Sequence, residues 1–139
     1  MRPDVSNDPL APDMAVLNKS LLDQYRGRKN NLLERLIDAY LTQAPGLLQQ
    51  LRKAAEQNDL KGMRAYSHAL KSCGYNLGAI RVSKICQEIE TAAALGDATI
   101  ATEATARIAC ECFDAEQALR SELFELKKAK SGSIEPSIV

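Results

Sequence analysis

Apolar residues recur every three or four positions over most of the chain, which is the spacing that lines one side of an α-helix. The clearest run lies within residues 29–57. Pro45 falls inside this run and removes one backbone hydrogen bond, yet the apolar spacing continues in phase beyond it. We therefore predict one helix over about 29–57, bent at the proline, with an inner face formed by Leu33, Ile37, Tyr40, Ala44, Leu47, Leu51 and Ala54.

Capping residues and glycines divide the rest of the chain into four more predicted helices. Asn18 and Asp59 are residue types that cap helix N-termini, and Gly27, Gly78 and Gly96 are placed to end helices. The predicted spans are about 18–26, 60–77, 81–95 and 98–128. The longest of them is expected to bury a stripe formed by Ile100, Ala104, Ile108, Cys112, Ala115, Leu119, Leu123 and Leu126.

Four long amphipathic helices joined by short turns predict an antiparallel four-helix bundle, with the short first helix lying across one end. An all-α fold also suits the composition, because 45% of the residues are hydrophobic but only 4% are aromatic. We expect one domain over residues 15–128, with flexible tails at 1–14 and 129–139. We also expect a monomer, since the helices can cover one another's apolar stripes. An apolar stripe left exposed on the last helix would contradict this.

The charge balance and the apolar content argue against several classes of protein. The 18 basic and 18 acidic residues cancel, so no overall field favours binding to nucleic acid or to an anionic membrane. No apolar run approaches the roughly 20 residues of a membrane span, and the N-terminus lacks the apolar core of a signal peptide, so a cytoplasmic location is expected. The four cysteines are expected to be small buried side chains. Cys110 and Cys112 point in different directions on a helix, so no metal site is predicted.

The predicted helix over 60–77 places the only histidine of the chain, His68, in the middle of its outward side. The inner side is formed by Leu60, Met63, Ser67, Leu70, Gly74 and Leu77, with Tyr66 and Cys73 at its margin. A glycine inside a helix costs about 1 kcal/mol relative to alanine, so Gly74 indicates a close approach by a neighbouring helix. The outward side carries, besides His68, the side chains of Lys61, Arg64, Ala65, Lys71, Ser72 and Tyr75.

Positive charge is concentrated around this histidine. Residues 60–87 contain five basic side chains and no Asp or Glu, an arrangement that suits an anion at the ring or an acidic partner surface. A neutral imidazole can attack phosphorus, and Arg64 and Lys71 can offset the charge of the phosphoryl group. The small side chains at Ala65 and Ser72 leave room for it. No Gly-rich phosphate loop and no acidic cluster for magnesium are present, so another protein must supply the catalytic groups.

The segment HALKSCGYNLGA, residues 68–79, resembles the signature of histidine-phosphotransfer (Hpt) domains. The shared features are the histidine, a leucine and a lysine shortly after it, a small residue, and a closing Asn-hydrophobic-Gly-Ala. The likeness extends upstream over residues 32–68 and downstream over ICQEIETAAALGD. The whole resemblance covers roughly residues 15–126. Ser72 departs mildly from the pattern, because the family often has glycine there.

The resemblance implies a helical bundle whose exposed histidine exchanges a phosphoryl group with the aspartate of a receiver domain. That receiver would belong to a hybrid histidine kinase or to a response regulator, and it would hold the magnesium ion. The chain itself would need no cofactor and would be a phosphoryl carrier rather than an enzyme. Carried over, His68 is the phosphoacceptor, Lys71 favours the phosphorylated state, and Gly78 ends the helix.

One alternative function remains open from the sequence. A helical adaptor that binds receiver or kinase domains without carrying phosphate would use the same basic helix face. The presence of His68 together with Lys71 argues against it, because an adaptor needs no nucleophile there. A metal-dependent hydrolase is disfavoured, since one histidine and scattered carboxylates supply too few ligands.

Overall fold

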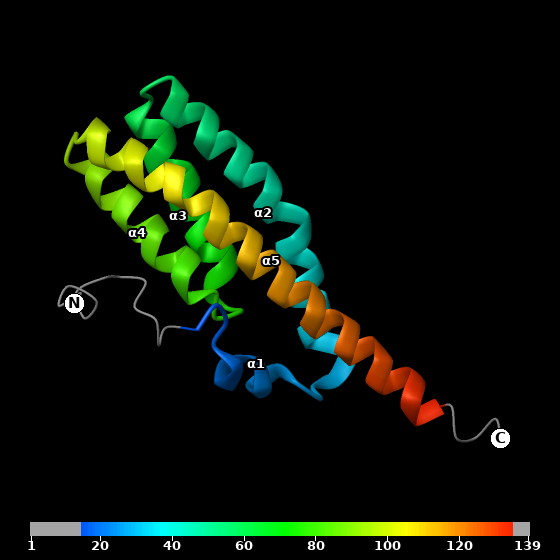
Figure 1. Ribbon diagram of the computed structural model, residues 1–139. Helices are drawn as coiled ribbons and strands as arrows, with labels where there is room; N and C mark the ends of the chain where they lie inside the picture. The colour runs from blue at the N-terminus through cyan, green and yellow to red at the C-terminus, as the bar shows by residue number, and fades with distance from the viewer. Residues whose placement is uncertain (1–14, 135–139) are drawn as a thin grey trace, which may run out of the picture.

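A computed structural model describes residues 15–134 of the chain, all helices and turns. The elements are α1 (Lys19–Tyr25), the short 3-10 helix η2 (Lys29–Asn31), α2 (Leu32–Glu56), α3 (Leu60–Tyr75), α4 (Ile80–Ala94) and α5 (Ala98–Ile134). Figure 1 shows α2, α3, α4 and α5 as an antiparallel bundle. The predicted all-α four-helix bundle is confirmed.

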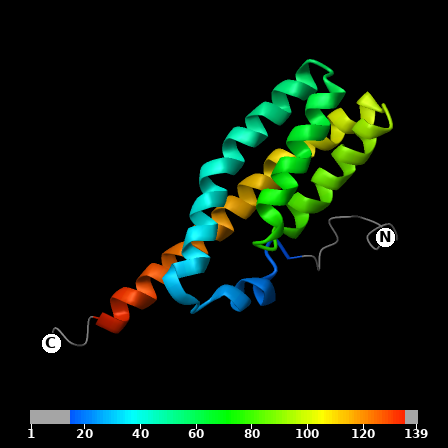
Figure 2. The same cartoon turned by 180° about the vertical axis from the view of Figure 1, so that it is seen from behind.

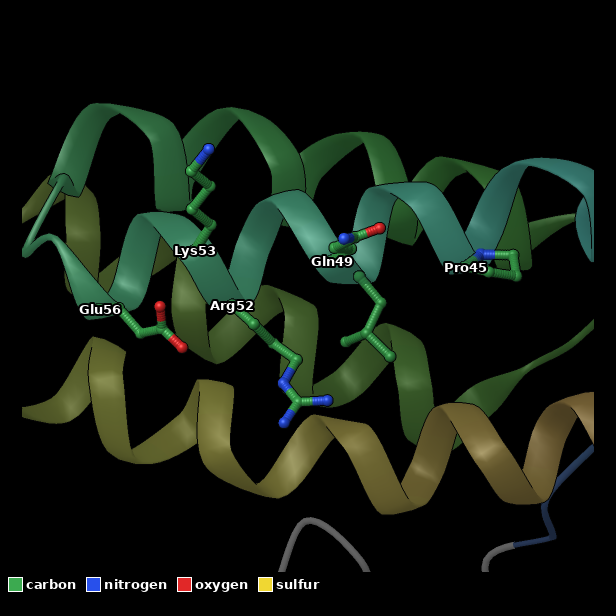
Figure 3. Close-up of a pocket in the computed structure, with 6 residues that line it drawn as sticks. Pro45, Gln49, Arg52, Lys53 and Glu56 are labelled. Atoms are coloured by element: carbon green, nitrogen blue, oxygen red, sulfur yellow. The ribbon is translucent and has the colours of Figure 1, made fainter.

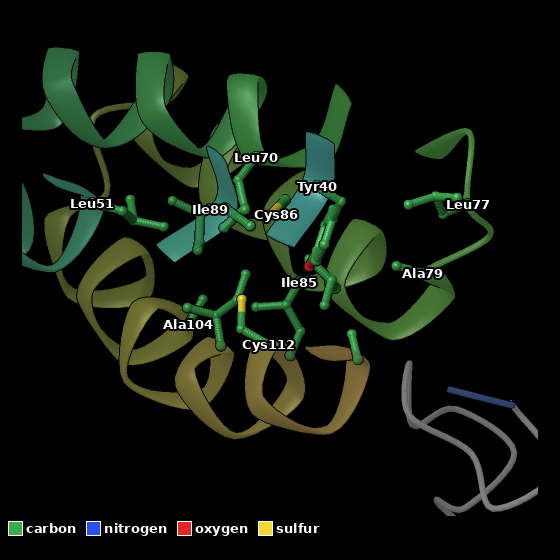
Figure 4. Close-up of a cluster of buried hydrophobic side chains, with 14 of the residues drawn as sticks. Tyr40, Leu51, Leu70, Leu77, Ala79, Ile85, Cys86, Ile89, Ala104 and Cys112 are labelled. Atoms are coloured by element: carbon green, nitrogen blue, oxygen red, sulfur yellow. The ribbon is translucent and has the colours of Figure 1, made fainter. Parts of the chain in front are cut away.

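Each long helix of the bundle packs mainly against two others. Helix α2 contacts α3 and α5, and α4 contacts the same two, while α3 and α5 lie on opposite corners and touch little. Apolar side chains from all four helices meet in one core, part of which is drawn in Figure 4. Leu51, Leu70, Ile89 and Ile108 are each fully buried there, one from each long helix. The core is largely aliphatic, as the composition indicated, with Tyr40 as its buried aromatic residue.

Helix α1 lies across one end of the bundle, as predicted (Figures 1 and 2). Its N-cap residue Asn18 accepts a hydrogen bond from Leu21 N through its side chain and donates its own backbone N–H to Gly78 O at 2.8 Å. On its other side, Glu122 of α5 accepts hydrogen bonds from Lys19 at 2.8 Å and Arg26 at 3.1 Å. These contacts join α1 to the α3–α4 turn and to α5.

The second helix begins three residues later than its apolar pattern predicted. Asn30 and Asn31 have φ values of 63° and 54°, which are left-handed and cannot continue a right-handed helix. Residues 29–31 therefore form a short 3-10 turn before α2 starts at Leu32. Beyond that point the helix is continuous through Pro45 to Glu56.

The last helix differs from its prediction in length and at its start. It continues to Ile134, so residues 129–134 of the predicted tail are helical. Lys130 contacts Glu34 and Asn31, which ties this extension to the beginning of α2. Near its start, Ala101 is buried and Ile100 is exposed, because the buried stripe begins one residue later than predicted. The predicted tails at 1–14 and 135–139 lie outside the described residues.

The cysteines also differ in part from their prediction. Cys86 and Cys112 are buried and Cys73 is half-buried, but Cys110 is exposed on the outer side of α5. Cys110 and Cys112 thus point in different directions, as the helical spacing predicted. Within residues 15–134, no helix is both long and apolar enough to cross a bilayer.

Candidate functional site

Helix α3 is held in one rotation about its axis by its cap and its buried side. The Asp59 side chain caps its N-terminus by accepting a hydrogen bond from Gly62 N at 2.9 Å. Met63, Ser67 and Leu70 are buried, and the Ser67 hydroxyl donates to Met63 O at 2.6 Å, so this inward polar group is satisfied within the helix. His68 is therefore directed away from the core.

The His68 side chain is 62% exposed, and one of its two ring nitrogens is engaged. Nδ1 lies 2.9 Å from Oε2 of Glu90, on the facing helix α4. An ionised carboxylate only accepts hydrogen bonds, so Nδ1 carries the proton of the neutral ring. Nε2 is then left with its lone pair on an exposed side chain, which makes it the nucleophilic atom.

Glu90 joins the histidine to Lys71. Its second carboxylate oxygen, Oε1, accepts a hydrogen bond from Lys71 Nζ at 2.7 Å. Lys71 also donates to Gln87 Oε1 at 2.9 Å, and Gln87 in turn donates to Thr91 Oγ1 at 3.0 Å. The hydrogen bond from Lys71 holds the pKa of the Glu90 carboxyl below its usual value; burial opposes this and the bond from His68 adds to it. Glu90 is thus held as a carboxylate between two hydrogen-bond donors.

The structure places most of the predicted outward side chains around His68 as expected. Arg64 lies one turn before the histidine, Ser72 one turn after it, and both are exposed. Tyr75 is 71% exposed, nearly two turns beyond the histidine. The remaining exposed members of this face are Lys61 and Ala65.

Lys71 does not match the outward position predicted for it. Its side chain is only 23% exposed, because it lies against α4 with its ammonium group on Glu90 and Gln87. The basic stretch that the sequence showed is therefore partly neutralised where it meets α4. Among residues 15–130, no ion pair engages Lys61 or Arg64, which leaves these two cations on the exposed face.

Two residues of this site, Glu90 and Gln87, were missed by the sequence analysis. The stretch without acids ends at Gln87, and the first acids after it are Glu88 and Glu90. Only the antiparallel pairing of α3 with α4 shows that Glu90, 22 residues after His68, faces the histidine. Glu88 points elsewhere, and pairs with Arg107 of α5 at 2.5 Å. The sequence signal for Glu90 was an acidic residue about as far after the α3–α4 turn as His68 lies before it. Glu88 fits the same description, so the sequence alone could not tell which of the two faces His68.

Two glycines shape the end of α3. A Cβ atom on Gly74 would lie 3.1 Å from Ala79 Cβ and 3.4 Å from a ring carbon of Tyr40, so α3 approaches α2 and the next turn closely there. Gly78 has a φ of +67°, and a Cβ atom on it would lie 2.6 Å from Asn18 Cβ. Both positions support the turn that brings α4 back along α3.

The His68 side chain lies on the exposed side of α3. A hollow of about 430 Å³ runs along α2, lined by Pro45, Leu48, Gln49, Arg52, Lys53 and Glu56, and it contains none of the predicted site residues (Figure 3). In the part of the chain that the structure describes, no group of three His, Cys, Asp or Glu side chains could hold a metal ion. The arrangement is an open surface around a single nucleophile, suited to another protein rather than to a small substrate.

Comparison with known proteins agrees with the helical-bundle fold. Two solved structures share the fold. Histidine-containing phosphotransfer protein B (HptB) from Pseudomonas aeruginosa PAO1 is 20% identical, with a TM-score of 0.74 over 79% of this chain and 96% of that one. The Hpt domain of a sensor hybrid histidine kinase from Shewanella is 24% identical, with a TM-score of 0.70 over 81% of this chain and 97% of that one.

No match was found among curated proteins. The model of the Hpt domain family matches residues 35–129, which include α3, α4 and most of α2 and α5. The chain therefore belongs to the Hpt domain family, whose members are phosphoryl carriers in phosphorelays.

Proposed function

We propose that His68 accepts a phosphoryl group from the phosphoaspartate of one receiver domain and passes it to the aspartate of another. The donor would be the receiver of a hybrid sensor kinase and the acceptor that of a response regulator. The observation that carries this proposal is the exposed imidazole whose Nδ1 is held by Glu90 at 2.9 Å, which leaves Nε2 for attack.

The transfer step balances with groups that the site contains. Nε2 attacks phosphorus, the bond between phosphorus and the aspartyl oxygen breaks, and the aspartate leaves as a carboxylate. The ring still carries its proton on Nδ1 and so becomes a cation. The Glu90 carboxylate lies against that proton and stabilises the positive charge. The reverse attack by a second aspartate returns the ring to its neutral form.

Lys71 supports the phosphorylated state through the same cluster. Its ammonium group lies 2.7 Å from Glu90 Oε1, and the His68 ring binds Oε2 of the same carboxylate. The Glu90 carboxylate therefore bridges Lys71 and the histidine. A phosphoryl group on His68 adds negative charge beside it. Lys71 then pairs with both anions, and Arg64 offers a second cation from the exposed side.

The exposed face of α3 serves as the docking surface for the receiver. Ala65 and Ser72 flank the histidine with small side chains, which let the receiver's active site approach the ring. Tyr75 offers an exposed aromatic contact at one end, and Lys61 and Arg64 offer positive charge at the other. The receiver brings the magnesium ion and the other catalytic groups, so the chain acts as a carrier with no cofactor of its own.

Phosphoryl transfer to His68 can be measured with a phosphorylated receiver domain as donor. We expect an acid-labile, alkali-stable phosphate on the wild-type chain and none on His68→Gln. Because the His68 side chain is 62% exposed, this variant should keep the helicity and melting temperature of the wild type. Labelling that survives in His68→Gln contradicts the proposal. A chain that binds receivers tightly but takes up no phosphate from any of a panel would instead be an adaptor.

The contribution of Lys71 can be separated from general surface charge. Lys71→Ala removes the cation bound to Glu90, so we expect the phosphohistidine to hydrolyse roughly tenfold faster, about the effect of losing one charged hydrogen bond. Lys61→Ala is the matched control. It removes an equal charge from the exposed face of α3, two helical turns before His68. Equal hydrolysis rates in both variants would restrict Lys71 to a surface role. The measurement is the half-life of the isolated phosphoprotein.

A further inference from the structure

Both phenylalanines of the chain lie on the surface instead of in the core. The sequence contains two, Phe113 and Phe124, and their exposed fractions are 61% and 64%. A buried phenylalanine contributes as much apolar stabilisation as any aliphatic core residue, so two exposed rings forgo a contribution that the core could have had. Exposed aromatic residues that gather on one face mark an interaction surface.

The two rings share one face of α5. They are 11 residues apart, about three helical turns, and therefore project in nearly the same direction. Gln117 and Arg120 lie between them on that face. Beside Phe113, a groove of about 240 Å³ between α5 and α2 extends the apolar surface over Leu41, Pro45 and Leu48. We call the face formed by Phe113, Gln117, Arg120 and Phe124 the α5 stripe.

The described helices leave the α5 stripe uncovered. Figure 1 shows α5 in front of the other helices of the bundle, and α5 packs with its opposite side against α2 and α4. Helix α3, which carries His68, lies at the opposite corner of the bundle from α5. A molecule bound to the α5 stripe therefore leaves the histidine face free.

We infer that the α5 stripe binds a second copy of this chain in an antiparallel, two-fold arrangement. A two-fold axis midway between the two rings places Phe113 of each copy opposite Phe124 of the other. Two aromatic pairs then form at once, and the groove beside each Phe113 provides an apolar surface next to the incoming ring. The inference does not depend on the phosphorelay function.

Glu116, at the edge of the α5 stripe, and Arg120, within it, are charges that complement each other under the same symmetry. Glu116 and Arg120 lie almost equally far on either side of the axis, so Arg120 of one copy faces Glu116 of the other. Within one chain, Arg120 donates two hydrogen bonds to Glu116 Oε2, at 3.1 and 2.9 Å. Its side chain remains 56% exposed, so further guanidinium N–H groups are free to bind the carboxylate of the second copy. This charge pattern favours a second copy over an unrelated apolar partner.

The first test is the mass of the chain in solution, measured by sedimentation equilibrium over about a hundredfold range of concentration. We expect the mass to rise from 15.2 kDa toward twice that value as concentration increases. Phe113→Ser and Phe124→Ser should each remain monomeric, with unchanged helicity because both side chains are exposed. Leu95→Ser removes an apolar side chain that is even more exposed, at 79%, and lies elsewhere, so this variant should still dimerise. A wild-type chain that stays monomeric throughout, or a dimer that both serine variants preserve, overturns the inference.

The second test asks whether the charges pair between copies. Glu116→Arg alone and Arg120→Glu alone each place like charges opposite one another across the axis, so each variant should dimerise at least tenfold more weakly than wild type. A mixture of the two variants restores opposite charges at both contacts of the mixed dimer, although the pair within each chain stays broken. We expect mixed dimers to recover the affinity of the wild type. If the mixture stays as weak as its components, the two-fold pairing is wrong.

Discussion

A single carboxylate, that of Glu90, determines which atom of His68 is available for chemistry. An imidazole exchanges its proton between two nitrogens, and a site without a fixed acceptor leaves both forms populated. Glu90 selects the form with the proton on Nδ1, and it remains ionised because Lys71 holds its pKa below the usual value. The same carboxylate is in place to stabilise the ring when it becomes a cation. Glu90 is therefore a positioning residue that acts through His68.

Replacing Glu90 tests this role at the level of one hydrogen bond. We expect Glu90→Ala to slow phosphoryl transfer by about tenfold to a hundredfold, because the ring loses both its orienting acceptor and its counter-charge. The nitrogen-15 shifts of His68 should also change from one dominant tautomer to a mixture. Glu88→Ala, two residues away and paired with Arg107 instead, is the control and should leave both measurements as in the wild type. An unchanged tautomer in Glu90→Ala would remove the positioning role.

At the scale of the helices, the turn between α3 and α4 decides whether His68 and Glu90 meet. The backbone N–H groups of Leu77 and Ala79 donate to Gly74 O at 3.1 Å, and Gly78 N donates to Tyr75 O, so the chain reverses within a few residues. Asn18 then binds the carbonyl of Gly78 and places α1 over this turn. Gly78 is needed for its left-handed backbone and also for the space that Asn18 occupies.

Alanine substitution separates these two requirements. Gly78→Ala and Gly96→Ala both force a non-glycine residue into a left-handed conformation, at φ values of +67° and +79°. Each should therefore destabilise the fold by about 1 kcal/mol through the backbone alone. Only in Gly78→Ala would the new Cβ atom also clash with Asn18, whose own Cβ would lie 2.6 Å away. This clash should lower the free energy of unfolding by a further ~1 kcal/mol or more. Urea unfolding of the two variants measures the difference. Equal losses would mean that α1 moves aside without cost.

At the scale of the whole molecule, ion pairs link separate helices, and three of the glutamates that form them have a lowered carboxyl pKa. Glu34 joins α2 to Lys130 of α5, Glu90 joins α4 to α3, and Glu122 joins α5 to Lys19 and Arg26 at α1. The hydrogen bond from Lys130 lowers the pKa of Glu34. Burial alone would raise the pKa of Glu122, but the bonds from Lys19 and Arg26 outweigh it, and the pKa is lowered.

These lowered pKa values predict that acid weakens the fold. A carboxyl whose pKa is lower in the folded state contributes stability above its ordinary value of 4.5, and the contribution is lost as the pH falls through the folded value. We expect the free energy of unfolding in urea to fall by roughly 1–3 kcal/mol below pH ~4.5. The triple variant Glu34→Gln, Glu90→Gln, Glu122→Gln should be less stable at neutral pH and lose less on acidification. An equal loss in both proteins would assign the acid effect to other groups.

The sequence by itself determined the helices, the bundle and the outward position of His68. Each of these follows from local rules, because apolar spacing sets which side of a helix is buried, and caps and glycines set where it ends. Its errors lie where features other than apolar spacing, caps and glycines decide the outcome. The start of α2 depends on two left-handed asparagines, and α5 continues past 128 because Lys130 finds Glu34 and Asn31 on another helix.

Only the tertiary structure decided how the histidine is assisted. Glu88 and Glu90 are chemically identical and only two residues apart on the same helix, and nothing in the order of residues says that one faces Arg107 and the other His68. The rotation of α4 about its axis, set by its packing against α3 and α5, determines which glutamate faces His68. It also places Glu90 and Gln87 where they bind the Lys71 ammonium group. The exposed phenylalanines of α5 have the same origin: a helical stripe can be read from the sequence, but whether another helix covers it depends on packing.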